Sequence, residues 1–201
     1  MKKGPLYTIL FMLMITAVFT GILAFANQAT LARVEANQRM KVLRSHMYAF
    51  DIPISPSAGD KEVEDLYYSR VEERKMGALK VYVAMDEGGK VRGYGIPFTG
   101  PGLWGTIEGF LALSSDKSRI LGIDFISHSE TPGLGARIDE APFKEQFRGV
   151  VLNKGGKPLG FRPNEPEGQV DAVTGATITS TSVENMMNQA VGMFLEQAGG
   201  K

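Results

Sequence analysis

A short segment near the C-terminus combines small side chains with hydroxyl groups in a pattern suited to holding a phosphate. Residues 171–182 read Asp-Ala-Val-Thr-Gly-Ala-Thr-Ile-Thr-Ser-Thr-Ser. Gly175 and Ala176 let the backbone approach a bulky ligand, and Thr177 presents a hydroxyl beside backbone amides that can donate hydrogen bonds. These residue types therefore predict a phosphate-binding turn.

An amphipathic helix is expected directly after this turn. From Val183 to Leu195 the apolar residues recur at the spacing of one helix face. Thr181 followed by Glu184 matches a capping box, which would start the helix there. The unpaired amides and the positive dipole end of a helix start favour an anion. A hydroxyl-rich run before a helix is also the ordinary form of a helix cap, so the residues alone leave the cap-only interpretation open.

Composition excludes several classes of site. The 201 residues include 22 Lys and Arg and 22 Asp and Glu, and this balance gives no electrostatic case for nucleic-acid binding. Cysteine is absent, which excludes disulfides, thiolate-bound clusters and zinc–cysteine sites. The two histidines are too few for a histidine-built metal site. The length suggests one compact domain with an appendage.

The appendage is an N-terminal segment long and apolar enough to cross a membrane. After Lys3 no charged residue occurs until Arg33, and about twenty apolar residues are needed to span a bilayer as a helix. We expect a cytoplasmic N-terminus at 1–4 and a transmembrane helix at 5–26. A cleaved signal peptide is the alternative, since Ala-Phe-Ala at 24–26 has the pattern of a cleavage site. Basic residues flank both ends, so charge does not fix the orientation.

Residues 27–78 are expected to form a juxtamembrane helix and a linker region. Apolar residues at helical spacing run from Leu31 to Phe50, and prolines, serines and a glycine within 53–59 then break the pattern. Residues 60–76 are rich in charge and are expected to form a solvated face. A flexible linker at 53–59 would let the following domain swing, which is a hypothesis.

Strand patterns begin at Leu79 and define the expected domain, residues 79–201. Residues 79–85 alternate in polarity and lead through a tight turn into 91–96, which predicts a hairpin. Residues 107–113 and 119–126 predict two further strands joined by a polar turn. We therefore expect an α+β fold: a transmembrane helix followed by one domain with a largely antiparallel sheet and flanking helices.

Two loops of this domain contain further candidate binding groups. Trp104, the only tryptophan, lies in Gly-Pro-Gly-Leu-Trp-Gly, where few neighbours could bury it, so a flat ring-binding surface is credible. The loop 128–135 has a proline and glycines that would expose backbone amides, and Glu130 and Thr131 add an acceptor and a hydroxyl.

These motifs resemble those of a known family. Asp171-x-x-Thr174-Gly175-Ala176-Thr177 looks like the flavinylation motif of the FMN-binding domain family. Together with the loop 128–135, it resembles the C-type subunit of the sodium-translocating NADH:quinone reductase and the related G-type subunit of the Rnf complex. In that family a separate flavin transferase joins FMN to the last threonine of the motif through a phosphoester. The resemblance therefore implies covalent FMN on Thr177.

The family also implies which other residues surround the flavin. The motif contributes three of them, Thr174, Gly175 and Ala176. The other positions that line the flavin in the family correspond here to Trp104, Glu130, Thr131, Gly133, Leu134, Lys154, Ile178 and Thr179. Lys154 would be a cation that favours the negatively charged reduced flavin, although a solvated turn lysine is the ordinary interpretation. No catalytic residue and no metal ligand is implied.

The resemblance implies an electron carrier rather than a complete catalyst. It would be one subunit of an ion-translocating NADH:quinone oxidoreductase in the bacterial cytoplasmic membrane, with its FMN domain outside and integral membrane subunits as partners. Gly102-Leu103-Trp104 favours the quinone-reductase form, whereas the short chain leaves the G-type subunit of the Rnf complex as the alternative. A stand-alone extracytoplasmic flavin reductase and a tethered binding module remain open.

Overall fold

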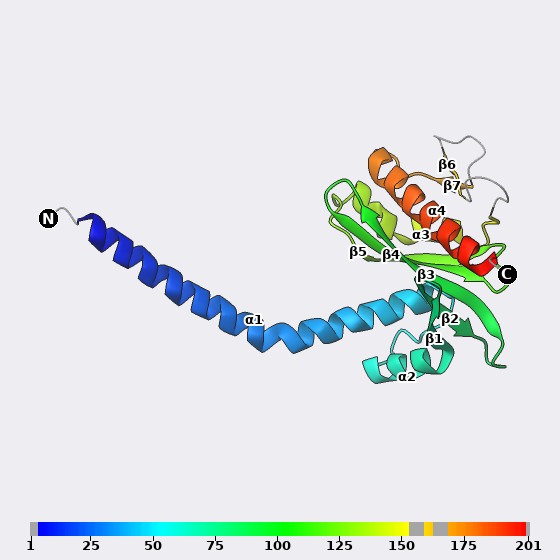
Figure 1. Ribbon diagram of the computed structural model, residues 1–201, viewed down its shortest axis with the longest axis horizontal. Helices are drawn as coiled ribbons and strands as arrows, with labels where there is room; N and C mark the ends of the chain where they lie inside the picture. Colours follow the sequence, from blue (N-terminus) through cyan, green and yellow to red (C-terminus); the bar gives the residue numbers. More distant parts are fainter. Residues whose placement is uncertain (1–3, 153–158, 163–168, 200–201) are drawn as a thin grey trace. The chain divides into compact units, whose positions relative to one another are not determined.

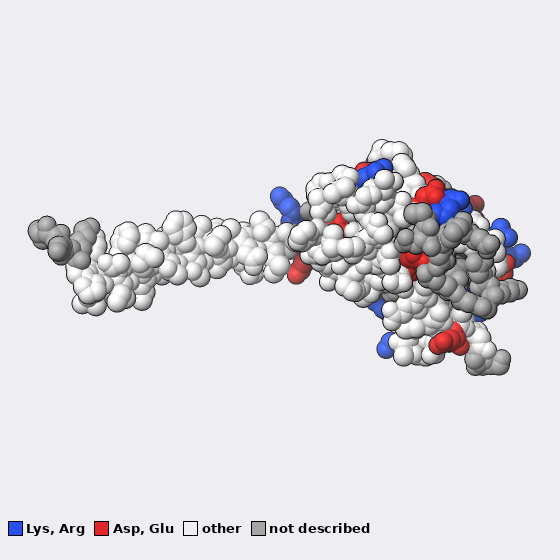
Figure 2. Space-filling view, turned by 90° about the horizontal axis from the view of Figure 1, so that it is seen from above, with Lys and Arg blue, Asp and Glu red and all other residues white. Residues whose placement is uncertain are grey.

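The computed structural model describes residues 4–152, 159–162 and 169–199. The chain divides into two compact units, Met1–Met40 and Lys41–Lys201. Helix α1 (Pro5–Ala49) runs from the first unit into the second (Figure 1). Its most apolar window has a mean hydropathy of 2.5, and within the described ranges α1 alone is long and apolar enough to span a membrane. Figure 2 shows no charged residues on the visible face of its N-terminal part. Helix α1 therefore fits a single-pass membrane anchor.

The second unit is built on a five-stranded antiparallel sheet with the order β1-β2-β3-β4-β5. Its strands are β1 (Val71–Met76), β2 (Leu79–Met85), β3 (Val91–Pro101), β4 (Thr106–Ser114) and β5 (Ile120–Ser127). Two short strands, β6 (Phe161–Arg162) and β7 (Val170–Asp171), form a separate parallel pair. The expected hairpin and the two strands after it are confirmed, and so is the α+β class.

Short helices and one long helix complete the unit. They are α2 (Asp60–Arg70), the 3-10 helix η1 (Gly135–Asp139), α3 (Ala141–Lys144), the 3-10 helix η2 (Glu145–Phe147) and α4 (Thr177–Gly199). Helix α4 packs against β3 and lies across one face of the sheet (Figure 1). This packing fixes the N-terminus of α4 relative to the sheet.

Side chains of β4 pack on both faces of the sheet, because neighbouring residues of a strand point to opposite sides. Leu111 is fully buried in the cluster that includes Val191 of α4. The preceding residue, Phe110, points to the other face. Its ring centroid lies 3.7 Å from that of His46, in α1, and 5.5 Å from that of Phe50, directly after α1. The C-terminal part of α1 is therefore part of the core of the second unit.

Strand β1 differs from the sequence expectation, which placed the first strand at Leu79. Its sequence Val-Glu-Glu-Arg-Lys-Met has no alternation of apolar and polar residues, and only Val71 is buried. The strand lies at the edge of the sheet and pairs with β2 alone. An edge strand needs little apolar surface, and charged side chains on it discourage pairing with other chains. This is why the sequence pattern missed it.

Hydrogen bonds tie both ends of the loop between α1 and α2 to the second unit. Arg92 donates hydrogen bonds to the carbonyls of Phe50 and Asp51, each at 2.9 Å. Arg44 donates to the carbonyl of Ala58 at 3.2 Å. Residues 53–59 belong to the second unit, and a swing there stays a hypothesis.

Candidate functional site

Helix α4 begins at Thr177, one turn earlier than expected. Thr181 and Glu184 therefore lie inside the helix, and the predicted capping box is wrong. The run of hydroxyl residues belongs to the first turns of the helix itself, because Gly175, with φ of +81°, turns the chain just before Thr177. The carbonyl of Ala176 then accepts the first helical hydrogen bond, from the Ser180 amide at 3.0 Å.

Ser180 has a structural role that the sequence pattern did not predict. Its Oγ accepts a hydrogen bond of 3.0 Å from the backbone amide of Val173, and this ties the preceding segment to the helix. Ser180 is buried. Its place in a hydroxyl-rich run was visible in the sequence, but the helix start that gives it this role was not.

The first turn of α4 presents hydrogen-bond donors suited to an anion. The backbone amides of Thr177, Ile178 and Thr179 find no acceptor within residues 4–152, 159–162 and 169–199, as expected for the first amides of a helix. Thr177 is exposed, so its hydroxyl is accessible beside these donors. Unpaired amides and the positive end of the helix dipole together favour a phosphate here.

Glu130 brings two of the predicted loops to this helix start. Its Oε1 accepts the backbone amides of Leu103 at 2.8 Å and Trp104 at 3.2 Å. Its Oε2 accepts the Thr179 hydroxyl at 2.5 Å. The carboxylate is buried, with the residue 5% exposed. It therefore joins the β3–β4 turn, the loop after β5 and the first turn of α4.

Exposed apolar side chains gather at the same place. Trp104 is 69% exposed and Ile178 is 59% exposed, and Leu103 and Leu134 are also exposed. A Cβ built on Gly175 would lie 3.4 Å from Leu134 Cδ2, which places Leu134 beside the turn before α4. Large apolar side chains left exposed around a polar centre indicate a binding surface. The expected ring-binding position of Trp104 agrees with this exposure.

The other predicted residues lie close to this surface, with one exception. The Thr131 carbonyl accepts the amides of Leu134 and Ala136, each at 3.1 Å, so Thr131 shapes the loop. Gly133 has φ of +74° and is exposed. Thr174 is exposed, whereas Ala176 is buried. Lys154 lies outside the described residues.

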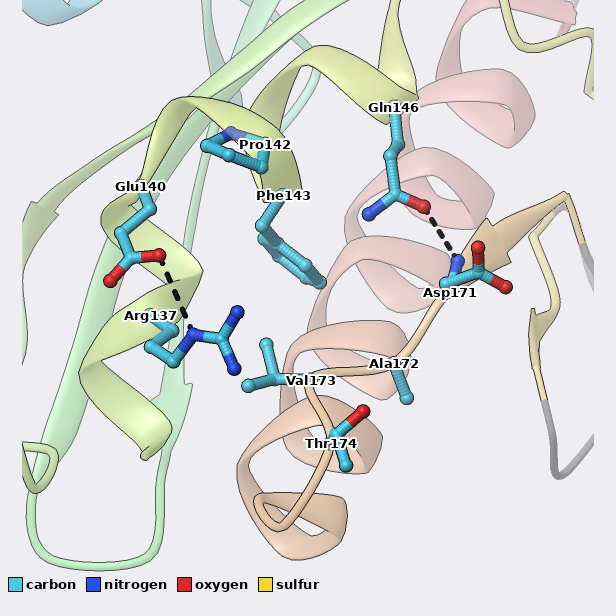
Figure 3. Close-up of a pocket in the computed structure, with 9 residues that line it drawn as sticks. All are labelled: Arg137, Glu140, Pro142, Phe143, Gln146, Asp171, Ala172, Val173 and Thr174. Carbon is cyan, nitrogen blue, oxygen red and sulfur yellow. Dashed lines mark hydrogen bonds and ion pairs between the residues drawn. The ribbon is translucent and has the colours of Figure 1, made fainter. Parts of the chain in front are cut away.

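A small pocket of about 120 Å³ adjoins the segment before α4. Figure 3 shows Arg137 pointing toward Val173 from the side of η1, and Gln146 accepting a hydrogen bond of 2.8 Å from the Asp171 amide. Of the predicted flavin residues only Thr174 lines this pocket. Its volume is well below the roughly 300–1,000 Å³ of typical ligand pockets. The predicted residues therefore converge on the open apolar surface and not on this pocket.

Asp171, the acidic residue of the motif, is engaged elsewhere in the structure. The structure pairs its Oδ1 with Arg162 Nε at 2.7 Å, and its backbone belongs to the β6–β7 pair. Asp171 therefore has an ion-pair partner of its own beside the motif. This arrangement is consistent with a threonine that needs an outside enzyme for activation.

Comparisons with known proteins found one family model and several similar proteins. The family model described as the FMN-binding domain matches residues 102–192. The chain is 33% identical over 196 residues to the G-type subunit of the ion-translocating oxidoreductase complex of Methanosarcina acetivorans, and the match covers 94% of this chain and 93% of that protein. It is 32% identical over 121 residues to the C-type subunit of the Na⁺-translocating NADH-quinone reductase of Yersinia pestis, and this match covers 57% of this chain. The chain spans about half the length of that relative, 46%.

Solved structures show the same fold. The crystal structure of NqrC from Shewanella oneidensis matches with a TM-score of 0.69 at 21% identity, covering 83% of this chain and 100% of that chain. The crystal structure of the C-type subunit of the Na⁺-translocating NADH-quinone reductase from Parabacteroides distasonis also matches with a TM-score of 0.69, at 25% identity, covering 81% of this chain and 94% of that chain.

Proposed function

Because the chain belongs to the FMN-binding domain family, we propose that it is a membrane-anchored electron-transfer subunit that carries FMN. The observation that carries the proposal is the convergence at the start of α4. An accessible threonine hydroxyl and three amides without an acceptor in the described chain lie beside an exposed apolar surface that includes Trp104. The hydroxyl and the amides suit a phosphate, and the apolar surface suits a flat ring.

The described residues fit FMN attached through its phosphate to Thr177. The Thr177 oxygen would form the ester bond, and the amides of Ile178 and Thr179 would donate to the remaining phosphate oxygens. Gly175 leaves the approach to the hydroxyl open, since a Cβ there would meet only Leu134. A separate flavin transferase would form the bond, because an unactivated threonine hydroxyl is a weak nucleophile and Asp171 of the motif is paired with Arg162.

Bound FMN would supply one-electron chemistry, and the protein would set its position and its surroundings. Exposed Trp104, Leu134 and Ile178 would pack against the ring without enclosing it. An open ring allows a redox partner to come close, which suits a carrier better than an enzyme that must enclose a substrate. The chain would thus act as one subunit of an oxidoreductase complex.

The anchor places this carrier in a membrane. Helix α1 would hold the chain in the bacterial cytoplasmic membrane beside integral membrane subunits, with the flavin on the outer side. Two complexes are candidates. The Gly-Leu-Trp sequence at 102–104 favours a Na⁺-translocating NADH-quinone reductase. The match to the G-type subunit from Methanosarcina acetivorans, which covers 93% of that protein, favours instead an ion-translocating oxidoreductase complex that contains a G-type subunit.

Purification of the assembled complex from native membranes would test this function. We expect the chain to co-purify with integral membrane subunits and its flavin to be reduced and reoxidised during turnover in a rapid-mixing experiment. Reduction of the flavin by NADH would favour the quinone reductase. Reduction by ferredoxin would favour the complex that contains a G-type subunit. A chain that purifies alone and reduces a soluble acceptor would contradict the carrier role and support the stand-alone flavin reductase.

A further inference from the structure

We infer that Glu130 is a positioning residue, which holds the turn at Trp104 in register with the attachment point at Thr177 and places a buried negative charge beside the flavin. This inference rests on the proposed function. The sequence resemblance implies that Glu130 lines the flavin, but the structure gives its carboxylate partners within the protein.

The contacts of Glu130 connect segments that are distant in the sequence. Its Oε1 binds the amides of Leu103 and Trp104, 27 and 26 residues away. Its Oε2 binds the hydroxyl of Thr179, 49 residues away. Hydrogen bonds to a charged acceptor are stronger than those between neutral groups. One side chain therefore sets the distance between the ring-facing turn and the start of α4.

Two glycines leave the space that this carboxylate fills. A Cβ on Gly102 would lie 2.4 Å from Glu130 Oε1, and a Cβ on Gly135 would lie 2.6 Å from Oε2 and 2.7 Å from Thr179 Oγ1. Contacts this short are not tolerated, so any other residue at either position would displace the carboxylate. The glycines and Glu130 thus form one built arrangement.

The charge of Glu130 has a second consequence. Within the described residues no lysine, arginine or histidine lies within the 4.0 Å ion-pair distance of its carboxylate. Its stabilisation comes from the two amides, the Thr179 hydroxyl and the nearby positive end of α4. A negative charge that has no ion-pair partner in the described part of the chain, and is poorly solvated, opposes the addition of electrons to a neighbouring flavin. Glu130 therefore lowers the flavin reduction potential.

The substitution Glu130→Gln tests the charge while keeping the shape. The glutamine oxygen can still accept from the Leu103 and Trp104 amides, and its NH₂ group can donate to Thr179 Oγ1. Thr179→Val keeps the Glu130 charge and removes only the link to α4. Glu87→Gln, at an exposed acid of the β2–β3 turn, is the control for loss of a distant charge. Thermal unfolding of all three full-length variants establishes that they fold.

The first measurement is amide hydrogen exchange in full-length protein made without flavin transferase. In Glu130→Gln the Leu103 and Trp104 amides should exchange at least about threefold faster than in the parent chain, because a neutral acceptor binds them less strongly. In Glu87→Gln these amides should exchange at the parent rate. Unchanged exchange in Glu130→Gln would overturn the positioning role, and this result does not depend on flavin.

The second measurement is redox titration of the flavin-loaded full chain. Glu130→Gln should shift the reduction potential to a more positive value, and Glu87→Gln should leave it unchanged. In Thr179→Val the attached flavin should fluoresce more strongly, because its ring is no longer held against Trp104. Equal potentials in Glu130→Gln and the parent chain, or unchanged fluorescence in Thr179→Val, would overturn the inference. A parent chain that carries no flavin at all would instead contradict the proposed function.

Discussion

At the scale of single residues, His46 shows how burial fixes a charge state. It is 2% exposed, its Nδ1 lies 2.8 Å from the Tyr67 hydroxyl, and its ring stacks on Phe110. Burial, with a smaller contribution from Lys80, lowers its pKa from 6.5 to about 3. The histidine is therefore neutral in the folded protein at neutral pH and serves in packing.

This neutral histidine predicts a pH dependence of stability. Below pH 6.5 the unfolded chain binds a proton at His46, but the folded chain binds it only near pH 3. The free energy of unfolding should therefore be fully present above pH 6.5 and fall as the pH drops toward 3, by at most about 5 kcal/mol. Urea unfolding of the second unit, Lys41–Lys201, above and below pH 6.5 measures this. His46→Phe should flatten the profile, and an equally steep profile in that variant would exclude His46 as the cause.

At the scale of elements, the start of α4 depends on the conformation of Gly175. Its φ of +81° is costly for any residue with a Cβ. Gly175→Ala should therefore lower the free energy of unfolding by about 1–2 kcal/mol. Gly192→Ala is the matched control, because Gly192 lies inside α4 with nothing within 4 Å of an added Cβ. That change should raise stability by up to about 1 kcal/mol. Denaturant midpoints that move in the same direction in Gly175→Ala and Gly192→Ala would contradict this role of Gly175.

Elements with a strong local pattern could be predicted from the sequence. The hairpin of β2 and β3 follows from alternation and a tight turn, and the long apolar run of α1 from composition alone. Strand β1 could not be predicted, since an edge strand needs almost no buried side chains. The start of α4 was placed one turn late because hydroxyl residues suggest a cap even where they continue as helix.

The sequence named most residues of the candidate site, but it did not predict the hydrogen bonds that join them. The motif predicts Thr177 as the attachment point, and the glycine-rich turn predicts Trp104 as a ring-binding residue. The bonds from Glu130 to Leu103, Trp104 and Thr179 join residues 26 to 49 positions apart, and no local pattern encodes such pairings. Leu103 was not predicted, because an exposed leucine has no distinctive sequence signal.

At the scale of the whole molecule, the two compact units predict where the chain can be cut. The second unit begins at Lys41 and includes Met47 and Phe50, which are completely buried. A chain that begins at Lys41 should fold and remain a substrate for the flavin transferase. A chain that begins at Leu79 lacks β1 and both buried side chains, whose loss costs about 2–5 kcal/mol each, and it should not fold cooperatively. Circular dichroism during thermal unfolding distinguishes these outcomes, and a cooperative transition in the shorter chain would contradict this division.

We propose that FMN is esterified to Thr177, and intact mass spectrometry is the decisive experiment. The full chain should be made with a flavin transferase, alongside Thr177→Ala and the control Thr181→Ala inside α4. We predict one added FMN on the parent chain and on Thr181→Ala, and an unmodified mass for Thr177→Ala. An unmodified parent chain, or FMN still bound covalently to Thr177→Ala, would contradict the account.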